Sequence, residues 1–346
     1  MTINSKTLIH LGGLALLLAA PSRGASVPAG VFVVNTKSAS VSLIDLKTNT
    51  EVRKIPVGST PYGVALVQDG TTLAVGVEGE EKVKFYDTKA FKLKGETKVG
   101  KMHNDHIILT EDGKYLMVAN FFSDDVLGID VNSRKIAFRL KGLSAPHVVK
   151  YGPLNNRAFV TCKKVTGIGI IDPKTRKVLK NYELNVNPRS LTFSPDESKI
   201  YFGSFWVDGI FEMETESGKV TRLIGAPPPS ENAVPQEVTY HGVEAVGSKI
   251  LAANEGRSYV DVFDMGTGKQ LDRFTEVSKP CCIEKIPGHN TDPERVLISN
   301  IGDGTMTLAE VSQEGKLKKL ARIAVGNAPK RVVFTDNLIA TMSPSE

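Results

Sequence analysis

The sequence contains little cysteine and no strong excess of charge of either sign. Three cysteines in 346 residues exclude a fold held together by several disulfides. The formal net charge is only +5 and no run of lysine or arginine stands out, so nothing indicates nucleic acid as a partner. Beyond residue 20, no apolar stretch approaches the roughly 20 residues that span a bilayer. We therefore expect no membrane span downstream of the N-terminal segment.

That N-terminal segment has the pattern of a secretory signal. A weakly basic start ends at Lys6, a mostly apolar run follows from Leu8 to Ala20, and small residues near Ala25 offer a cleavage site. The apolar run is too short to cross a bilayer. We therefore expect residues 1–25 to be a signal peptide and residues 26–346 to form a single domain. The protein is then exported to the periplasm or the extracellular space.

The strongest pattern in the sequence is a unit that is repeated seven times. Short apolar runs that end in a small polar residue recur, such as FVVN ending at Asn35 and MVAN ending at Asn120. Ten residues after each of these ends lies an acid that closes a second apolar run. Successive acids are 42 to 50 residues apart, a period typical of repeat architectures. The seven acids are Asp45, Asp87, Asp130, Asp172, Glu214, Asp264 and Glu310.

Each repeat carries four β-type runs separated by turn signals. The runs alternate between apolar and polar residues, and glycine, asparagine and aspartate lie between them, which predicts hairpins. Four strands in about 42 residues is the size of one propeller blade. The sequence therefore predicts an all-β fold, a seven-bladed β-propeller with four-stranded antiparallel blades.

The two ends of the chain are predicted to close the ring. Val31 to Gly58 supplies the second, third and fourth strands of one blade, and Ala328 to Met342 supplies its first strand. Pairing these ends removes the exposed sheet edges. VFVVN at residues 31–35 and LIATM at residues 338–342 are both copies of the second strand, so one of them is expected to be displaced.

The repeat unit resembles the YVTN-type β-propeller repeat. A proline-led first strand, an S-P-D-type turn, an [FY]-V-[AT]-N run and a V-x-x-[IV]-D run recur over nearly all of Val31 to Met342. The resemblance implies the fold and does not imply an activity. Looser relatives include periplasmic propellers that bind d1-type haem, copper-containing propellers and lactonases, and they suggest different functions.

The rim of the channel is where a ligand site is expected. In a propeller the first strand of each blade lines the channel, and ligands bind where several blades converge. Aligning the repeats places polar, aromatic or thiol residues at the starts of these strands, and Trp206 falls on a turn of the same rim. The residues at or beside the strand starts are Tyr62, His103, Asp105, His106, His147, Arg189, His241, Cys281, Cys282, Lys330 and Arg331.

A metal site is one interpretation of this rim. Imidazole and thiolate are suitable ligands for copper or zinc. The candidate ligands are His103, His106 and His147, with His241 or Cys281 completing the set.

Two other chemistries are also open. Arg189, Lys330 and Arg331 suit the carboxylates of an anionic cofactor or ligand, with a histidine placed for a haem iron. A rim histidine beside Asp105 is a candidate base for hydrolysis of a lactone, although no nucleophile motif supports this. The cofactor is therefore copper, zinc, haem or none.

The interpretation that we favour is a monomeric, non-catalytic scaffold that binds a protein partner or a small ligand at the rim. The alternative is a metal- or haem-associated propeller, either a redox enzyme or a cofactor-assembly factor, and a lactonase-type hydrolase is a further alternative. The repeated asparagines and acids are expected to cap turns, because the same group recurs in every blade. Cys162 is expected too far from Cys281 to pair with it. Two alternatives remain open for Cys281 and Cys282: a disulfide between them, or small strand residues without a disulfide.

Overall fold

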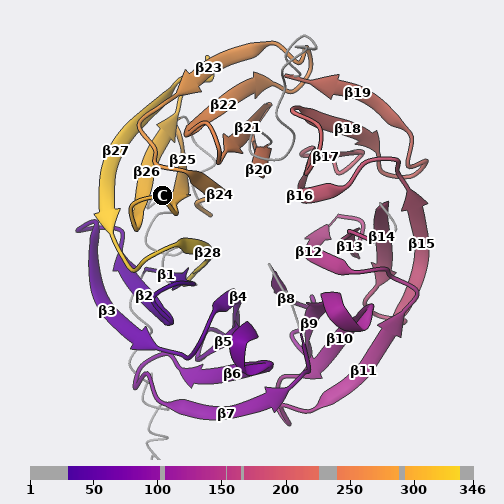
Figure 1. Cartoon of the computed structure of the whole chain (residues 1–346), viewed down its shortest axis with the longest axis vertical. Coiled ribbons are helices and arrows are strands. Elements are labelled where there is room, and N and C mark those ends of the chain that lie inside the picture. Colours follow the sequence, from indigo (N-terminus) through magenta and orange to yellow (C-terminus); the bar gives the residue numbers. More distant parts are fainter. Residues whose placement is uncertain are drawn as a thin grey trace, which may run out of the picture.

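The chain folds into seven four-stranded antiparallel sheets arranged in a ring around a central axis (Figure 1). The predicted seven-bladed β-propeller is therefore confirmed. The predicted signal peptide, the LIATM segment, His103 and Asp105 lie outside the residues that the structure describes. The computed structural model describes residues 30–101, 106–152, 154–164, 167–225, 240–287 and 293–335.

The innermost strand of each blade lines the channel. Five of these strands begin at a proline, which donates no N–H to a sheet and is tolerated as the first residue of a strand. In the order of blades 1 to 7, the innermost strands are β28 (Pro329–Phe334), β4 (Pro61–Val67), β8 (Ile107–Leu109), β12 (Pro146–Gly152), β16 (Pro188–Phe193), β20 (Tyr240–Val246) and β24 (Pro280–Lys285).

The second and third strands of each blade are buried along most of their length. Neighbouring blades cover both of their faces, which explains why these strands are continuous apolar runs. The second strands are β1 (Val31–Asn35), β5 (Thr72–Val77), β9 (Tyr115–Asn120), β13 (Arg157–Cys162), β17 (Lys199–Ser204), β21 (Lys249–Asn254) and β25 (Glu294–Asn300). The third strands are β2 (Ser40–Asp45), β6 (Lys82–Asp87), β10 (Asp125–Asp130), β14 (Gly167–Asp172), β18 (Ile210–Glu214), β22 (Tyr259–Asp264) and β26 (Thr305–Val311).

The fourth strands form the outer wall and are mostly exposed. Two short 3₁₀ helices, η1 (Glu78–Glu80) and η2 (Phe121–Ser123), connect the second and third strands of blades 2 and 3. The fourth strands are β3 (Thr50–Pro56), β7 (Leu93–Lys98), β11 (Ile136–Lys141), β15 (Lys177–Glu183), β19 (Val220–Ile224), β23 (Gln270–Phe274) and β27 (Leu317–Ala324).

The hydrophobic core is divided into clusters that lie between adjacent blades. Between blades 7 and 1, for example, Val31 and Val33 pack with Leu297 and Met306, all of which are essentially inaccessible to solvent. Each of the seven blade-to-blade contacts has a cluster of this kind. The stability of the ring therefore depends on every blade having two neighbours.

Pairing of the two chain ends closes the ring, as the sequence predicts. The C-terminal strand β28 pairs with the N-terminal strand β1, with Val31 opposite Phe334 and Val33 opposite Val332. The hydroxyl of Thr335 accepts a hydrogen bond from the Gly30 N–H at 2.8 Å, and the Thr335 N–H donates to the Gly30 carbonyl at 2.9 Å. VFVVN is therefore the second strand of blade 1.

The repeated acids cap turns, which confirms their predicted role. In five blades a carboxylate oxygen of the acid accepts a backbone N–H from the following turn at 2.7 to 2.8 Å. In Asp87, the bond from the Ala90 N–H is the main cause of a lowered pKa. The two glutamates differ, because Glu214 accepts from the Ser217 hydroxyl and Glu310 pairs with Arg295.

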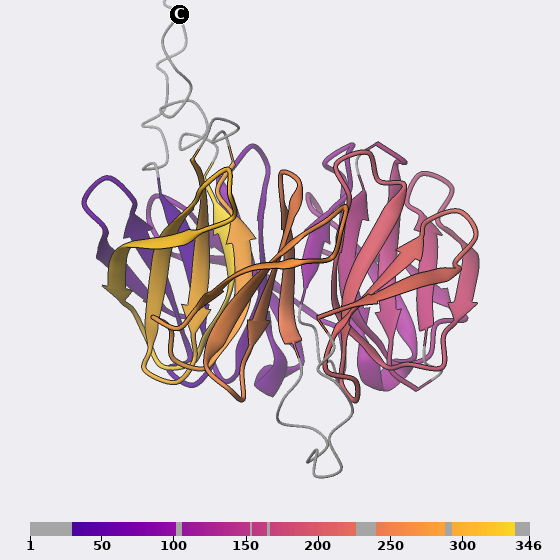
Figure 2. The ribbon, with the colours of Figure 1, turned by 90° about the horizontal axis from the view of Figure 1, so that it is seen from above.

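The alternating strand directions give the channel two distinct ends. The innermost strands begin at one end, where the turns between second and third strands also lie, and the remaining turns lie at the opposite end (Figure 2). Across the residues that the structure describes, no helix has the length and apolar character needed to cross a membrane.

Candidate functional site

Most of the predicted site residues lie at the end of the channel where the innermost strands begin. The second residue of six of these strands lies at this end, which we call the mouth. In blade 3, His106 directly precedes β8, whereas His103 and Asp105 lie outside the described residues. The mouth is formed by Tyr62, His147, Arg189, His241, Cys281 and Lys330.

A β-bulge follows the first residue of each of these six strands. In β24, Pro280 pairs with Asn300, and the next two residues, Cys281 and Cys282, together oppose the single Ser299. The register of β4, β12, β16, β20 and β28 shifts at the same place. A bulge re-aims side chains, so consecutive residues need not alternate between faces. The Ser299 hydroxyl accepts the Cys282 N–H at 2.9 Å, which satisfies an amide that the ladder leaves unpaired.

Blade 6 has a tyrosine where five other innermost strands have proline. The Tyr240 hydroxyl donates to Asp261 at 2.6 Å, and Asp261 is completely buried. Arg273 donates to both oxygens of the same carboxylate at 2.7 and 2.9 Å, and Gln270 adds a bond at 2.9 Å. The start of β20, and with it His241, is therefore held by a side-chain network.

The bulges of blades 6 and 7 bring an imidazole and two thiols together. Cys281 Sγ lies 3.3 Å from His241 Nδ1, 3.8 Å from His241 Nε2 and 3.4 Å from Cys282 Sγ. All three residues are buried, and their ligand atoms lie within 4.8 Å of one another. All three cysteines of the chain are thiols in this structure.

A lysine lies beside this group. Lys330 Nζ is 3.4 Å from Cys281 Sγ and 5.3 Å from the centre of the Tyr62 ring. Burial alone would raise the pKa of Cys281. The hydrogen bond from Cys282 and the electrostatic effects of His241 and Lys330 outweigh that effect and hold the Cys281 pKa well below its usual value. Donating to Cys281 raises the pKa of Cys282. Cys281 is therefore the more acidic of the two thiols.

Four charged residues continue from the mouth along the channel wall. Lys150 Nζ is 2.7 Å from Glu244, and Arg331 is 3.7 Å from Glu284. Burial is the main cause that raises the pKa of Glu284 to about 7, and the nearby Glu244 carboxylate adds to it. These residues come from the innermost strands of blades 4, 6, 7 and 1, so the inner strands of four blades carry charged side chains.

A second group of side chains lies on the mouth, at blades 4 and 5. Lys163 Nζ and Arg189 Cζ lie 4.2 and 4.3 Å from the centre of the Phe205 ring, and the His147 ring meets it edge-on at 6.1 Å. Lys163, Arg189 and Phe205 line a cavity of about 370 Å³ together with Asn187 and Trp206. The Trp206 side chain is 56% exposed. We call these five lining residues the basic–aromatic pocket.

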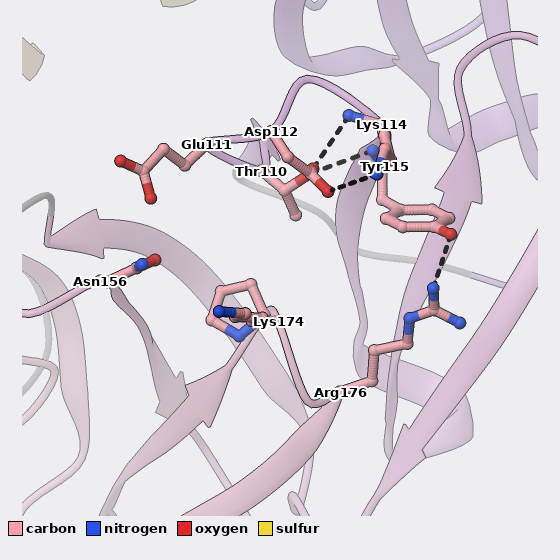
Figure 3. A pocket seen from close by; sticks show the side chains of 9 residues that line it. Thr110, Glu111, Asp112, Lys114, Tyr115, Asn156, Lys174 and Arg176 are labelled. Carbon is pink, nitrogen blue, oxygen red and sulfur yellow. Dashed lines mark hydrogen bonds and ion pairs between the residues drawn. The ribbon is translucent and has the colours of Figure 1, made fainter.

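The opposite end of the blades has a cavity of a different kind. It has a volume of about 330 Å³ and lies between the turns of blades 3 and 4 (Figure 3). Its polar groups bond to one another: Asp112 accepts from the Thr110 hydroxyl and the Lys114 N–H, and Arg176 donates to the Tyr115 hydroxyl at 2.6 Å. These bonds hold the turns of blades 3 and 4 in place, which gives the polar groups of this cavity a structural role.

The predicted site residues thus separate into two groups. His241, Cys281 and Lys330 are brought together, with Tyr62 and Arg331 beside them. Arg189 and Trp206 lie together in the basic–aromatic pocket, with His147 against Phe205. His147 therefore does not join His241 and Cys281, contrary to the metal set that the sequence suggested.

Cys282 was not predicted as a ligand, although the sequence shows it next to Cys281 after a proline. The bulge that brings both side chains together cannot be seen in the sequence. The repeat also gave no sign of the charged residues Lys150, Glu244 and Glu284, because they lie within apolar-looking strands.

Comparisons with known proteins agree with the fold. No family model matches the chain. The uncharacterized protein YncE of Salmonella typhi is 27% identical over 96 residues, which cover 28% of this chain and 27% of YncE. Antigen Lp49 of Leptospira interrogans is 23% identical over 205 residues, which cover 51% of this chain and 43% of Lp49. The chain spans less than half the length of these curated relatives.

Two solved structures resemble the whole ring. A chain of Kuenenia stuttgartiensis hydrazine synthase has a TM-score of 0.70 at 17% identity and covers 82% of this chain and 93% of its own. The dihydro-haem d1 dehydrogenase NirN, in complex with DHE, has a TM-score of 0.63 at 16% identity and covers 94% of this chain and 79% of its own. At such low identities the likeness establishes the propeller fold alone.

Proposed function

We propose that this chain is an exported binding propeller of the YVTN type, whose ligand is an anion with a planar apolar part. The observation that carries the proposal is the basic–aromatic pocket, in which Lys163 and Arg189 both lie against Phe205 beside the exposed Trp206. The pocket opens at the mouth, where several blades contribute residues to one site.

The chemistry of the pocket favours such a ligand over a neutral or cationic one. A guanidinium on an aromatic ring still directs its N–H groups within its own plane, where a carboxylate or sulfonate binds them in pairs. Trp206 offers a flat apolar surface for a ring. In the described turns at this end of blades 3 and 5, Asp124 pairs with Lys164 and Asp208 pairs with Arg257.

Two further observations support the proposal. NirN, which shares the fold, binds DHE, so a propeller of this shape can hold a ligand. The apolar N-terminal run supports export. A metal- or haem-associated propeller is the second candidate function, and the group formed by His241, Cys281 and Cys282 favours its metal-binding form.

A matched pair of small probes tests the proposed function. Naphthalene-2-sulfonate and 2-naphthylmethylammonium share a ring and carry opposite charges. We expect the sulfonate to bind at least about tenfold more tightly, a difference of about 1.4 kcal/mol, when both are titrated by ligand-observed NMR.

Two variants test whether the sulfonate binds in the basic–aromatic pocket. Arg189→Gln should weaken sulfonate binding about tenfold or more. Arg176→Gln should leave it within about twofold, because Arg176 stacks in the same way on Tyr115, with Cζ at 4.6 Å, but at the opposite end of the blades. Equal binding of the two probes, or an Arg189→Gln variant that binds as tightly as the wild type, would show that the proposal is wrong.

A further inference from the structure

The buried group of His241, Cys281 and Cys282 is not used by the proposed function. It lies at blades 6 and 7, whereas the basic–aromatic pocket lies at blades 4 and 5. We propose that these three residues form a binding site for a soft monovalent metal ion, Cu⁺.

The spacing of the donor atoms matches a metal site. Metal–sulfur bonds of about 2.3 Å and metal–nitrogen bonds of about 2.0 Å place ligand atoms about 3.5 to 4.0 Å apart in trigonal or tetrahedral geometry. Here Cys281 Sγ is 3.4 Å from Cys282 Sγ, 3.8 Å from His241 Nε2 and 3.3 Å from His241 Nδ1, and one ring nitrogen and the two sulfur atoms lie within 4.8 Å of one another. Movements of up to about 1 Å bring these atoms to the spacing of ligands around a bound ion.

The surroundings of the donors hold them in place without the ion. His241 Nδ1 lies 2.9 Å from the Cys281 carbonyl oxygen, and a carbonyl only accepts. Nδ1 is therefore the protonated nitrogen, and Nε2 has its lone pair available as a ligand. A backbone carbonyl is a common partner for the second nitrogen of a metal-binding histidine. On the cysteine side, the Ser299 hydroxyl fixes the bulge by accepting the Cys282 N–H.

The donor set suits Cu⁺ better than Zn²⁺. Thiolates are soft ligands that select Cu⁺ and Zn²⁺ over harder ions. Structural zinc requires four ligands, and the described group supplies three. Two thiolates and Cu⁺ together leave one negative charge, which faces the ammonium of Lys330 only 3.4 Å from Cys281 Sγ. With Zn²⁺ the same set would be neutral, and this complementarity would be lost.

The test is an anaerobic competition titration of the reduced full chain with Cu⁺ supplied as its bicinchoninate complex. We expect one tightly bound Cu⁺ per chain. Cys281→Ala, Cys282→Ala and His241→Gln should each weaken binding by at least about tenfold, whereas Cys162→Ala should not change it. Cys162 is a matched control, because it is also a buried thiol but lies in β13 of blade 4, outside the group.

Far-ultraviolet circular dichroism identifies any variant that fails to fold. The copper-edge X-ray absorption spectrum of the wild type then identifies the ligand atoms of the ion. We expect two sulfur ligands and one nitrogen ligand. The proposal is overturned if the wild type binds no Cu⁺, if the ligands are only nitrogen and oxygen, if folded variants of the group bind as tightly as the wild type, or if Zn²⁺ displaces Cu⁺. None of these outcomes depends on the naphthalene probes, so the two proposals fail separately.

Discussion

Removing the carboxylate of Asp261 should destabilise the propeller strongly. This group is fully buried and accepts four hydrogen bonds, from Tyr240, Gln270 and twice from Arg273. Asp261→Ala leaves the Tyr240 hydroxyl buried without its acceptor, which costs about 1–3 kcal/mol. Breaking a buried ion pair costs about 3–5 kcal/mol, but the Arg273 side chain is 48% exposed and can rehydrate. We therefore expect a loss of about 2–4 kcal/mol in the free energy of unfolding.

Urea unfolding followed by far-ultraviolet circular dichroism measures this loss as a lower midpoint with an unchanged slope. A second substitution, Tyr240→Phe in the Asp261→Ala background, should recover part of the loss because it removes the orphaned hydroxyl. Glu216→Ala is the control, since Glu216 pairs with Arg157 at the surface with its side chain 75% exposed, and it should cost less than about 1 kcal/mol. If Asp261→Ala and Glu216→Ala cost the same, the network does not hold the start of β20.

Three other predictions concern the ring. Gly128→Ala should lower the thermal midpoint of unfolding, because a Cβ there would lie 2.0 Å from the Phe138 ring, and overpacking costs about 1–3 kcal/mol; an unchanged midpoint would contradict this. Thr335→Val should cost about 1–3 kcal/mol in urea unfolding by leaving the buried Gly30 N–H without its hydroxyl acceptor, whereas a neutral effect would mean that this bond does not help to close the ring. Burial raises the pKa of Cys162 to about 12, so iodoacetamide at pH 8 should modify it only after unfolding, and mass spectrometry showing native modification would refute this.

The sequence predicted the architecture well because the same pattern of strands and turn residues recurs in every blade. The acid after the third strand binds the next turn's backbone N–H, so its spacing reveals the blades directly. Pairing of β28 with β1 also followed from counting strands. A strand count depends only on local patterns of apolar and turn residues, and these are visible in a single sequence.

The sequence predicted at which end of the propeller the site residues lie, but not which of them contact one another. Aligned strand starts place His147 and His241 at equivalent positions, but equivalent positions in a ring lie on different blades. His147 meets Phe205 of the next blade, whereas His241 meets Cys281. The direction of Cys282 depends on a bulge in the hydrogen-bond register, and composition and periodicity carry no sign of that shift.

The most direct test of whether the mouth attracts anions uses the only tryptophan of the chain. Trp206 lines the basic–aromatic pocket and is 56% exposed, so a charged quencher reports the local potential. We predict that, at low ionic strength, the ratio of iodide quenching to caesium quenching is several-fold higher for Trp206 than for neutral N-acetyltryptophanamide. The difference should shrink as salt is added, since the screening length falls to about 8 Å at 0.15 M. A ratio equal to that of N-acetyltryptophanamide, or lower, would contradict the attraction of anions.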